Sequence, residues 1–147
     1  MPNPNLDALA AAGTSAWLDD LSRQRLDTGN LADLVEELRV VGVTTNPAIF
    51  SVAMTTGDAY DGQLRELAGS GADAAETVFA MAIDDVKRAC DELAGVYERS
   101  GGADGRVSIE VDPRYADDYD ETIAQARSLW ATSLTSAMSS GLVRLHC

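Results

Sequence analysis

The spacing of apolar residues predicts that strands and helices alternate along this chain. Residues 16–21 form a short apolar run that ends in acidic residues, and we expect a strand there. Leucine and valine then recur at helical spacing over residues 31–38, which predicts a helix capped by Asn30 and stopped by Gly42. Residues 43–45 are apolar or β-branched and predict a second, buried strand.

A long helix is the clearest prediction for the middle of the chain. Pro47 can occupy the first position of a helix after the second strand, and short segments broken by glycines follow it. Asp73 and Glu76 have the spacing of a capping box at a helix start. Beyond them, apolar residues share one helix face: Phe79, Ile83, Val86, Cys90, Leu93 and Tyr97.

The third predicted strand has two unlike faces. Residues 106–112 alternate between polar and apolar side chains before Pro113 ends the run. Successive side chains of a strand point to opposite faces, so one face is apolar and the other polar. The polar face carries Ser108, Glu110 and Asp112.

This order of elements predicts an α/β fold in which crossover helices join parallel strands. A last helix follows, with an expected apolar stripe of Tyr119, Ile123, Ala126 and Trp130. An open sheet covered by helices on both faces normally has central strands that are apolar on both sides. A strand with one polar face favours a barrel, whose inner face can carry polar groups at the catalytic end. We therefore expect about the first three units of a (β/α)8 TIM barrel.

Three polar side chains fall at the predicted strand ends. Asp19, Asn46 and Glu110 would meet at one rim, because the carboxyl ends of parallel strands share one edge. Two carboxylates and an amide there could transfer protons and orient hydroxyl groups. The same residues also fit structural roles, in which Asp19 caps a turn, Asn46 caps the next helix and Glu110 faces solvent. The pattern leaves both interpretations open.

Composition and net charge disfavour some classes of binding partner. The net charge of −13 disfavours nucleic acid and acidic membranes, and no apolar run approaches the ~20 residues that span a bilayer. Cys90 and Cys147 fit a reducing compartment, so a cytoplasmic location is expected. No glycine-rich nucleotide loop is present, and the acidic residues lack the spacing of a metal-binding loop.

Three motifs resemble transaldolases and occur in the family's order. They are WLDDLSR at residues 17–23, GVTTNPAIF at residues 42–50 and VSIEVDPR at residues 107–114. The resemblance runs from about residue 6 to residue 130, and it is closest to the long type of transaldolase found in actinobacteria.

The resemblance implies an enzyme of the pentose phosphate pathway that transfers a dihydroxyacetone unit through a lysine Schiff base, without a cofactor or metal. Fructose 6-phosphate, erythrose 4-phosphate and sedoheptulose 7-phosphate are the implied substrates. Asp19 would be the acid/base of carbon–carbon cleavage, and Glu110 would act through a water on the imine. Thr44 and Asn46 would line the substrate pocket.

The sequence departs from the family after Trp130. The family's Schiff-base lysine should follow shortly, yet the chain's single lysine is Lys87, on the long predicted helix. We therefore expect a truncated or frameshifted transaldolase, with residues 1–130 as the N-terminal part of the barrel and residues 131–147 as a divergent, poorly ordered tail. Such a chain should be inactive alone. The alternative is a non-catalytic fragment or partner-binding module, which could self-associate through open sheet edges.

Overall fold

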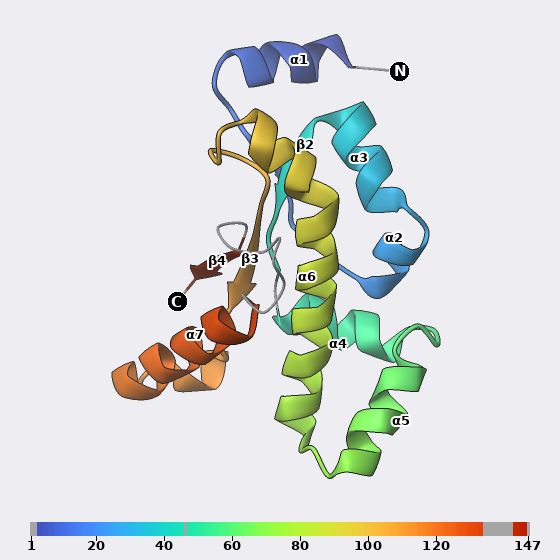
Figure 1. Ribbon diagram of the computed structural model, residues 1–147, viewed down its shortest axis with the longest axis vertical. Coiled ribbons are helices and arrows are strands. Elements are labelled where there is room, and N and C mark those ends of the chain that lie inside the picture. Colours follow the sequence, from blue (N-terminus) through green and yellow to red (C-terminus); the bar gives the residue numbers. More distant parts are fainter. Residues whose placement is uncertain (1–2, 46, 134–142, 147) are drawn as a thin grey trace.

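The computed structural model describes residues 3–45, 47–133 and 143–146, and its centre is one sheet of four parallel strands. The strands are β1 (Ala16–Leu18), β2 (Val40–Val43), β3 (Arg106–Glu110) and β4 (Val143–His146). They lie in the sheet in the order in which they occur in the chain (Figure 1). Each connection therefore moves one strand further in the same direction, as the winding of a barrel requires.

Helices fill the connections between the strands. They are α2 (Arg23–Asp27), α3 (Asn30–Leu38), α4 (Pro47–Thr55), α5 (Asp61–Ser70), α6 (Ala74–Arg99) and α7 (Tyr119–Ser133), with a 3-10 turn, η1 (Pro113–Tyr115), while α1 (Pro4–Ala11) precedes β1. Helix α3 packs on β2, α6 on β2 and β3, and α7 on β4, while α6 also contacts both α3 and α7. The α/β fold predicted from the sequence is confirmed as a partial (β/α)8 barrel.

The core lies between the sheet and α6. The capping box of Asp73 and Glu76 is formed as predicted, with both reciprocal hydrogen bonds at 2.9 Å, and it opens the 26-residue helix. The apolar stripe of this helix, centred on Val86 and Leu93, packs against Val107 of β3. All three of these side chains are fully buried. Burial of such side chains stabilises the fold by about 25 cal/mol per Å² of apolar surface.

Gly42 has a different role from the predicted one. Helix α3 ends at Leu38, where Arg39 adopts a left-handed conformation, and Gly42 lies inside β2. A side chain at this position would overlap the indole ring of Trp17, which pairs with Gly42 in the sheet. The glycine therefore makes room for a tryptophan on the neighbouring strand. Asn30 is the first residue of α3, and the capping position belongs to Gly29.

Two further predictions need correction near the end of the described chain. In α7 Ala126 is buried as predicted and Leu129 is buried as well, whereas Tyr119 is 79% exposed and Trp130 is 38% exposed, so the buried stripe coincides only in part with the predicted one. Strand β4 was not predicted at all, and it falls within the segment expected to be a poorly ordered tail. Residues 134–142 and 147 of that segment lie outside the described residues.

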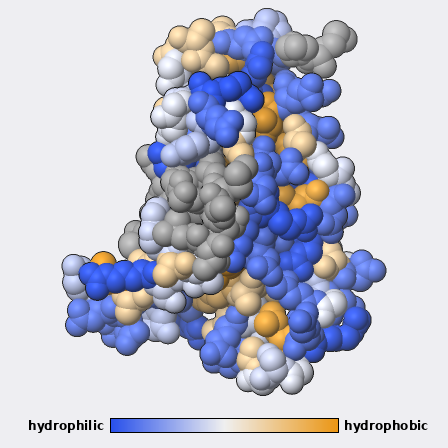
Figure 2. Space-filling model, in the orientation of Figure 1, coloured by the Kyte–Doolittle hydropathy of each residue, from blue (hydrophilic) through white to orange (hydrophobic). Residues whose placement is uncertain are grey.

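The molecular surface is mostly hydrophilic in the view of Figure 2, with isolated hydrophobic residues. This agrees with 24 acidic and 11 basic residues in the chain. Across the part of the chain that the structure describes, no helix is long and apolar enough to span a membrane.

Candidate functional site

The ends of β1 and β2 bring two predicted site residues together. The Thr44 amide donates a hydrogen bond to the Leu18 carbonyl oxygen at 2.8 Å, which extends the ladder between the two strands. The Thr44 hydroxyl then donates to the carboxylate of Asp19. Asp19 is exposed and Thr44 is half-buried, so the carboxylate is oriented by a neighbour and open to solvent. Asn46, two residues further, lies outside the described residues.

Glu110 ends β3 and is half-buried. It lines a cavity of about 390 Å³ together with Thr45, and the opposite wall comes from α6, where Phe79 is one of the lining residues. The preceding residue, Ile109, is 2% exposed and belongs to the core. Among the described residues, Glu110 makes no hydrogen bond to Asp19 or Thr44. The structure thus joins Asp19 to Thr44 and leaves Glu110 at a separate position along the same edge of the sheet.

Ser108 is a buried polar residue that the sequence analysis did not select as a site residue. Its side chain is 1% exposed, and its hydroxyl has no hydrogen-bond partner within the described residues. Val107 pairs with Val43 in the sheet, which places Ser108 beside Thr44 on the next strand. Buried hydroxyl groups are ordinarily hydrogen-bonded, so an unpaired one marks a place for another polar group. The period-two alternation of β3 was the signal that could have identified it.

Asp112, a neighbour of Glu110, has a structural role. It caps η1 by accepting the Arg114 amide at 2.9 Å and the Arg114 Nε–H at 2.9 Å and 3.0 Å. These hydrogen bonds from Arg114 lower the pKa of the Asp112 carboxyl below its ordinary value, against the opposite effect of burial. Asp112 is therefore an ionised capping residue at the turn into α7.

A buried polar cluster joins the segment after β1 to α5 and α6. The Arg23 Nε–H donates to Asp85 at 2.9 Å, and the Tyr60 hydroxyl donates to the other Asp85 oxygen at 2.7 Å. The Arg23 amide in turn donates to the Tyr60 hydroxyl oxygen at 2.8 Å, and the Arg23 guanidinium lies 4.5 Å from the centre of the Tyr60 ring. The Asp85 side chain is 0% exposed and that of Arg23 is 13% exposed.

Burial and hydrogen bonding act in opposite directions on this cluster. Burial raises the pKa of the Asp85 carboxyl, while the hydrogen bonds from Tyr60 and Arg23 favour its ionised form. Burial and the hydrogen bond to Asp85 both raise the pKa of Tyr60, so its hydroxyl remains a donor. Among the described residues, no buried side-chain nitrogen or oxygen of Arg23, Tyr60 or Asp85 lacks a hydrogen-bond partner, in keeping with the cost of leaving buried polar groups unpaired.

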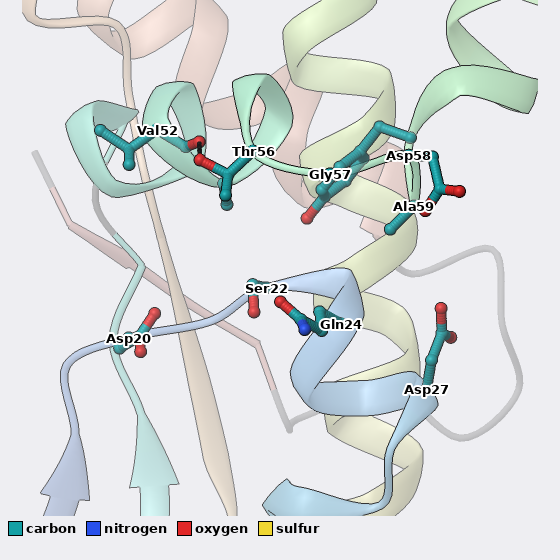
Figure 3. A pocket seen from close by; sticks show the side chains of 11 residues that line it. Asp20, Ser22, Gln24, Asp27, Val52, Thr56, Gly57, Asp58 and Ala59 are labelled. Atoms are coloured by element: carbon teal, nitrogen blue, oxygen red, sulfur yellow. Dashed lines mark hydrogen bonds between the residues drawn. The ribbon is translucent and has the colours of Figure 1, made fainter.

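A cavity of about 910 Å³ opens beside this cluster. Figure 3 shows Asp20, Ser22 and Gln24 on one side and Val52 and Thr56 on the other. Tyr60 also lines it. Helix α2 and the segment from α4 to α5 therefore face each other across an open hollow next to the end of β1.

Lys87 is half-buried on α6, in a surface hollow that is also lined by Arg23, Asp84 and Arg88. As the sequence predicted, Lys87 lies within a helix and does not lie at the end of a strand. Among the described residues, no group of three or more histidine, cysteine, aspartate or glutamate side chains is arranged to hold a metal ion.

Comparison with known proteins identifies transaldolases among the relatives of this chain. A model of the Transaldolase/Fructose-6-phosphate aldolase family matches residues 16–137. A transaldolase of Mycolicibacterium smegmatis is 62% identical over 128 residues, which are 87% of this chain and 34% of that protein. Transaldolases of Mycobacterium leprae (strain TN) and Frankia alni are 61% and 57% identical over 87% and 88% of this chain, and over 34% and 35% of their own lengths. The chain thus spans about a third of the length of these relatives.

Proposed function

Because this chain belongs to the Transaldolase/Fructose-6-phosphate aldolase family, we propose that residues 1–130 form the first part of a transaldolase active site. The observation that carries this proposal is the contact between Thr44 and Asp19 at the ends of two adjacent parallel strands. In (β/α)8 barrel enzymes, catalytic residues come from that edge of the sheet. The high identity to transaldolases over this segment supports the same assignment.

Asp19 is the proposed acid/base. When the carbon–carbon bond of a ketose phosphate breaks, a hydroxyl proton must leave as the carbonyl of the departing aldose forms, and a carboxylate can accept it. The hydrogen bond from Thr44 orients the Asp19 carboxylate for this transfer. The same proton returns when the dihydroxyacetone unit is joined to the acceptor aldose.

Glu110, Asn46 and Ser108 have supporting roles in this proposal. Glu110 works through a water molecule during formation and breakdown of the imine, and its half-buried place at the end of β3 is compatible with that role. Asn46 is proposed to bind hydroxyl groups of the dihydroxyacetone unit. The Ser108 hydroxyl on β3 has no hydrogen-bond partner among the described residues, and it is a third candidate for a polar contact with the substrate.

The chemistry needs a lysine that this chain does not supply at a strand end. An imine on that lysine accepts the electrons of the broken bond, and no other cofactor is required. The single lysine, Lys87, lies on α6. We therefore propose that the 147-residue chain has no transaldolase activity alone. Fructose 6-phosphate, erythrose 4-phosphate and sedoheptulose 7-phosphate are the proposed substrates of the complete site, in the pentose phosphate pathway and the cytoplasm.

A second candidate function is a non-catalytic, self-associating module. It is favoured by β1, which has a paired neighbour on one side within the described sheet. Unpaired strand edges promote association with other strands. Sedimentation of the chain over a range of concentrations tests this alternative, because self-association shifts the mass distribution as concentration rises.

A chimaera tests the main proposal. Residues 1–130 of this chain are joined to the part of the Mycolicibacterium smegmatis transaldolase that follows the matched segment. We expect the chimaera to release glyceraldehyde 3-phosphate from fructose 6-phosphate and erythrose 4-phosphate, and to form an adduct when trapped with borohydride. The 147-residue chain should do neither. A folded chimaera without turnover, or an adduct on Lys87 of the 147-residue chain, would overturn the proposal.

A further inference from the structure

The segment that carries Asp19 is fixed at both of its ends. On one side, the Leu18 carbonyl accepts the Thr44 amide at 2.8 Å and closes the ladder with β2. On the other side, Leu21 is buried in the core at 1% exposure. The Ser22 side chain caps α2 by accepting the Arg25 amide at 3.3 Å. Asp19 and Asp20 therefore lie between two anchored points of the chain, Leu18 on one side and residues 21–22 on the other.

The second anchor depends on the buried cluster of Arg23, Tyr60 and Asp85. The Arg23 backbone amide is held by the Tyr60 hydroxyl at 2.8 Å, and its side chain is held by Asp85 at 2.9 Å. Tyr60 directly precedes α5, on the connection that leaves β2, and Asp85 lies on α6, on the connection that leads to β3. Both residues therefore belong to the β2–β3 connection, and the cluster links it to the β1–β2 connection, which carries Arg23.

A gain in folding stability does not by itself explain a buried cluster of charged and polar side chains. Removing charged groups from water is costly, and apolar residues of similar volume often replace a buried ion pair without loss of stability. A buried pair with complete hydrogen bonding does, however, define one geometry, because a shifted arrangement would leave a charge unpaired. In this cluster, the hydrogen bonds fix the position of the Arg23 backbone, which lies four residues after Asp19.

We propose that Arg23, Tyr60 and Asp85 are positioning residues, which hold the segment after β1 so that the Asp19 carboxylate stays within reach of the Thr44 hydroxyl. This inference rests on the proposed function only for the role of Asp19. The cluster acts through the backbone at Arg23, since no hydrogen bond among the described residues joins its three side chains to Asp19 or Thr44.

The test measures the geometry of Asp19 directly in the 147-residue chain. The carboxyl-carbon NMR resonance of Asp19 is recorded in the unaltered chain and in Thr44→Val, which removes the donated hydrogen bond and gives the reference value for an unheld carboxylate. Tyr60→Phe keeps the ring over the Arg23 guanidinium and removes the hydroxyl that joins Arg23 to Asp85. Tyr119→Phe makes the same chemical change at a side chain that is 79% exposed.

We expect Tyr60→Phe to move the Asp19 resonance toward the Thr44→Val value by about half of the full difference or more, since two hydrogen bonds of the cluster are lost. Tyr119→Phe should leave the resonance unchanged. Arg23→Lys is a second variant that keeps the charge beside Asp85 and loses the Nε contact, and it should cause a smaller shift in the same direction.

A purely structural role predicts a different result, in which the variants unfold more easily while the Asp19 resonance of the folded form keeps its value. That outcome, in Tyr60→Phe or in Arg23→Lys if only the latter folds, overturns the inference. Failure of the proposed function is distinguishable from this, because it is measured as missing turnover in the chimaera and does not affect the Asp19 resonance.

Discussion

The two faces of the sheet differ in the polarity of their buried side chains. On the outer face, Val43, Val107 and Ile109 are buried under α6 and belong to one continuous apolar core. On the other face, Trp17 lies over Gly42, and Ser108 is buried with an unpaired hydroxyl. The outer face is packed by apolar side chains, whereas the inner face contains one buried hydroxyl, that of Ser108, which has no hydrogen-bond partner among the described residues.

This difference indicates which face of the sheet contributes mainly to stability and which face contributes mainly to function. Apolar packing contributes to folding wherever it occurs, and α6 gives the outer face that packing along β2 and β3. An unpaired hydroxyl contributes nothing to folding and costs free energy unless another group binds it. Around Ser108, the inner face should therefore tolerate changes that the outer face does not, and changes there should affect chemistry more than stability.

The largest effect on stability is expected on the outer face. Leu93→Ala removes a fully buried side chain from the middle of the core and should lower the free energy of unfolding by about 2–5 kcal/mol. Ser108→Ala, the matched change on the inner face, removes the unpaired hydroxyl and should be neutral or slightly stabilising. Urea unfolding of both variants gives the comparison. Equal losses at the two positions would remove the distinction between the faces.

A smaller effect is expected where the inner face is closely packed. Gly42→Ala places a methyl group where the Trp17 indole lies and should destabilise the chain by about 1–3 kcal/mol through overpacking. The tryptophan fluorescence of the folded chain should change as the ring moves. Gly69→Ala is the control, because this helical glycine has open space around it, and it should stabilise α5 by roughly 0.5–1 kcal/mol. An unchanged spectrum in Gly42→Ala would disprove the close packing.

The smallest effect concerns pH at the turn that follows β3. Arg114 lowers the pKa of Asp112 in the folded state, so their interaction stabilises the fold above the ordinary aspartate pKa of about 3.9 and is lost as pH falls through the lowered value. Arg114→Gln should therefore be less stable than the unaltered chain at neutral pH, and the difference should vanish in strong acid. Arg65→Gln, at an exposed ion pair with Asp61, should show little change at any pH. Thermal unfolding across acidic pH measures both.

Periodicity predicted most of the fold and two members of the candidate site. The alternation of β3 and the stripe of α6 come directly from local sequence, and both are confirmed around Val107 and Leu93. The alternation of Val143–His146 was a comparable signal for β4, but the serine-rich segment before it obscured the pattern.

Long-range features could not be predicted in the same way. The Trp17 ring over Gly42 and the cluster of Arg23, Tyr60 and Asp85 join residues 25 or more positions apart in the sequence, and no local pattern specifies their pairing. Asp19 and Thr44 were predicted at strand ends, but their hydrogen bond depends on the register of β1 and β2. Local sequence thus predicts which elements form, while their register decides which side chains meet.

The most direct test of the account is the effect of Asp19→Ala on turnover in the chimaera with the lysine-containing part of the relative. The account predicts that turnover falls by about 10²–10⁴-fold, the usual contribution of a general acid or base, while the melting temperature stays close to that of the parent chimaera. Turnover within about threefold of the parent, in a variant that folds normally, would contradict the assignment of Asp19 as the acid/base.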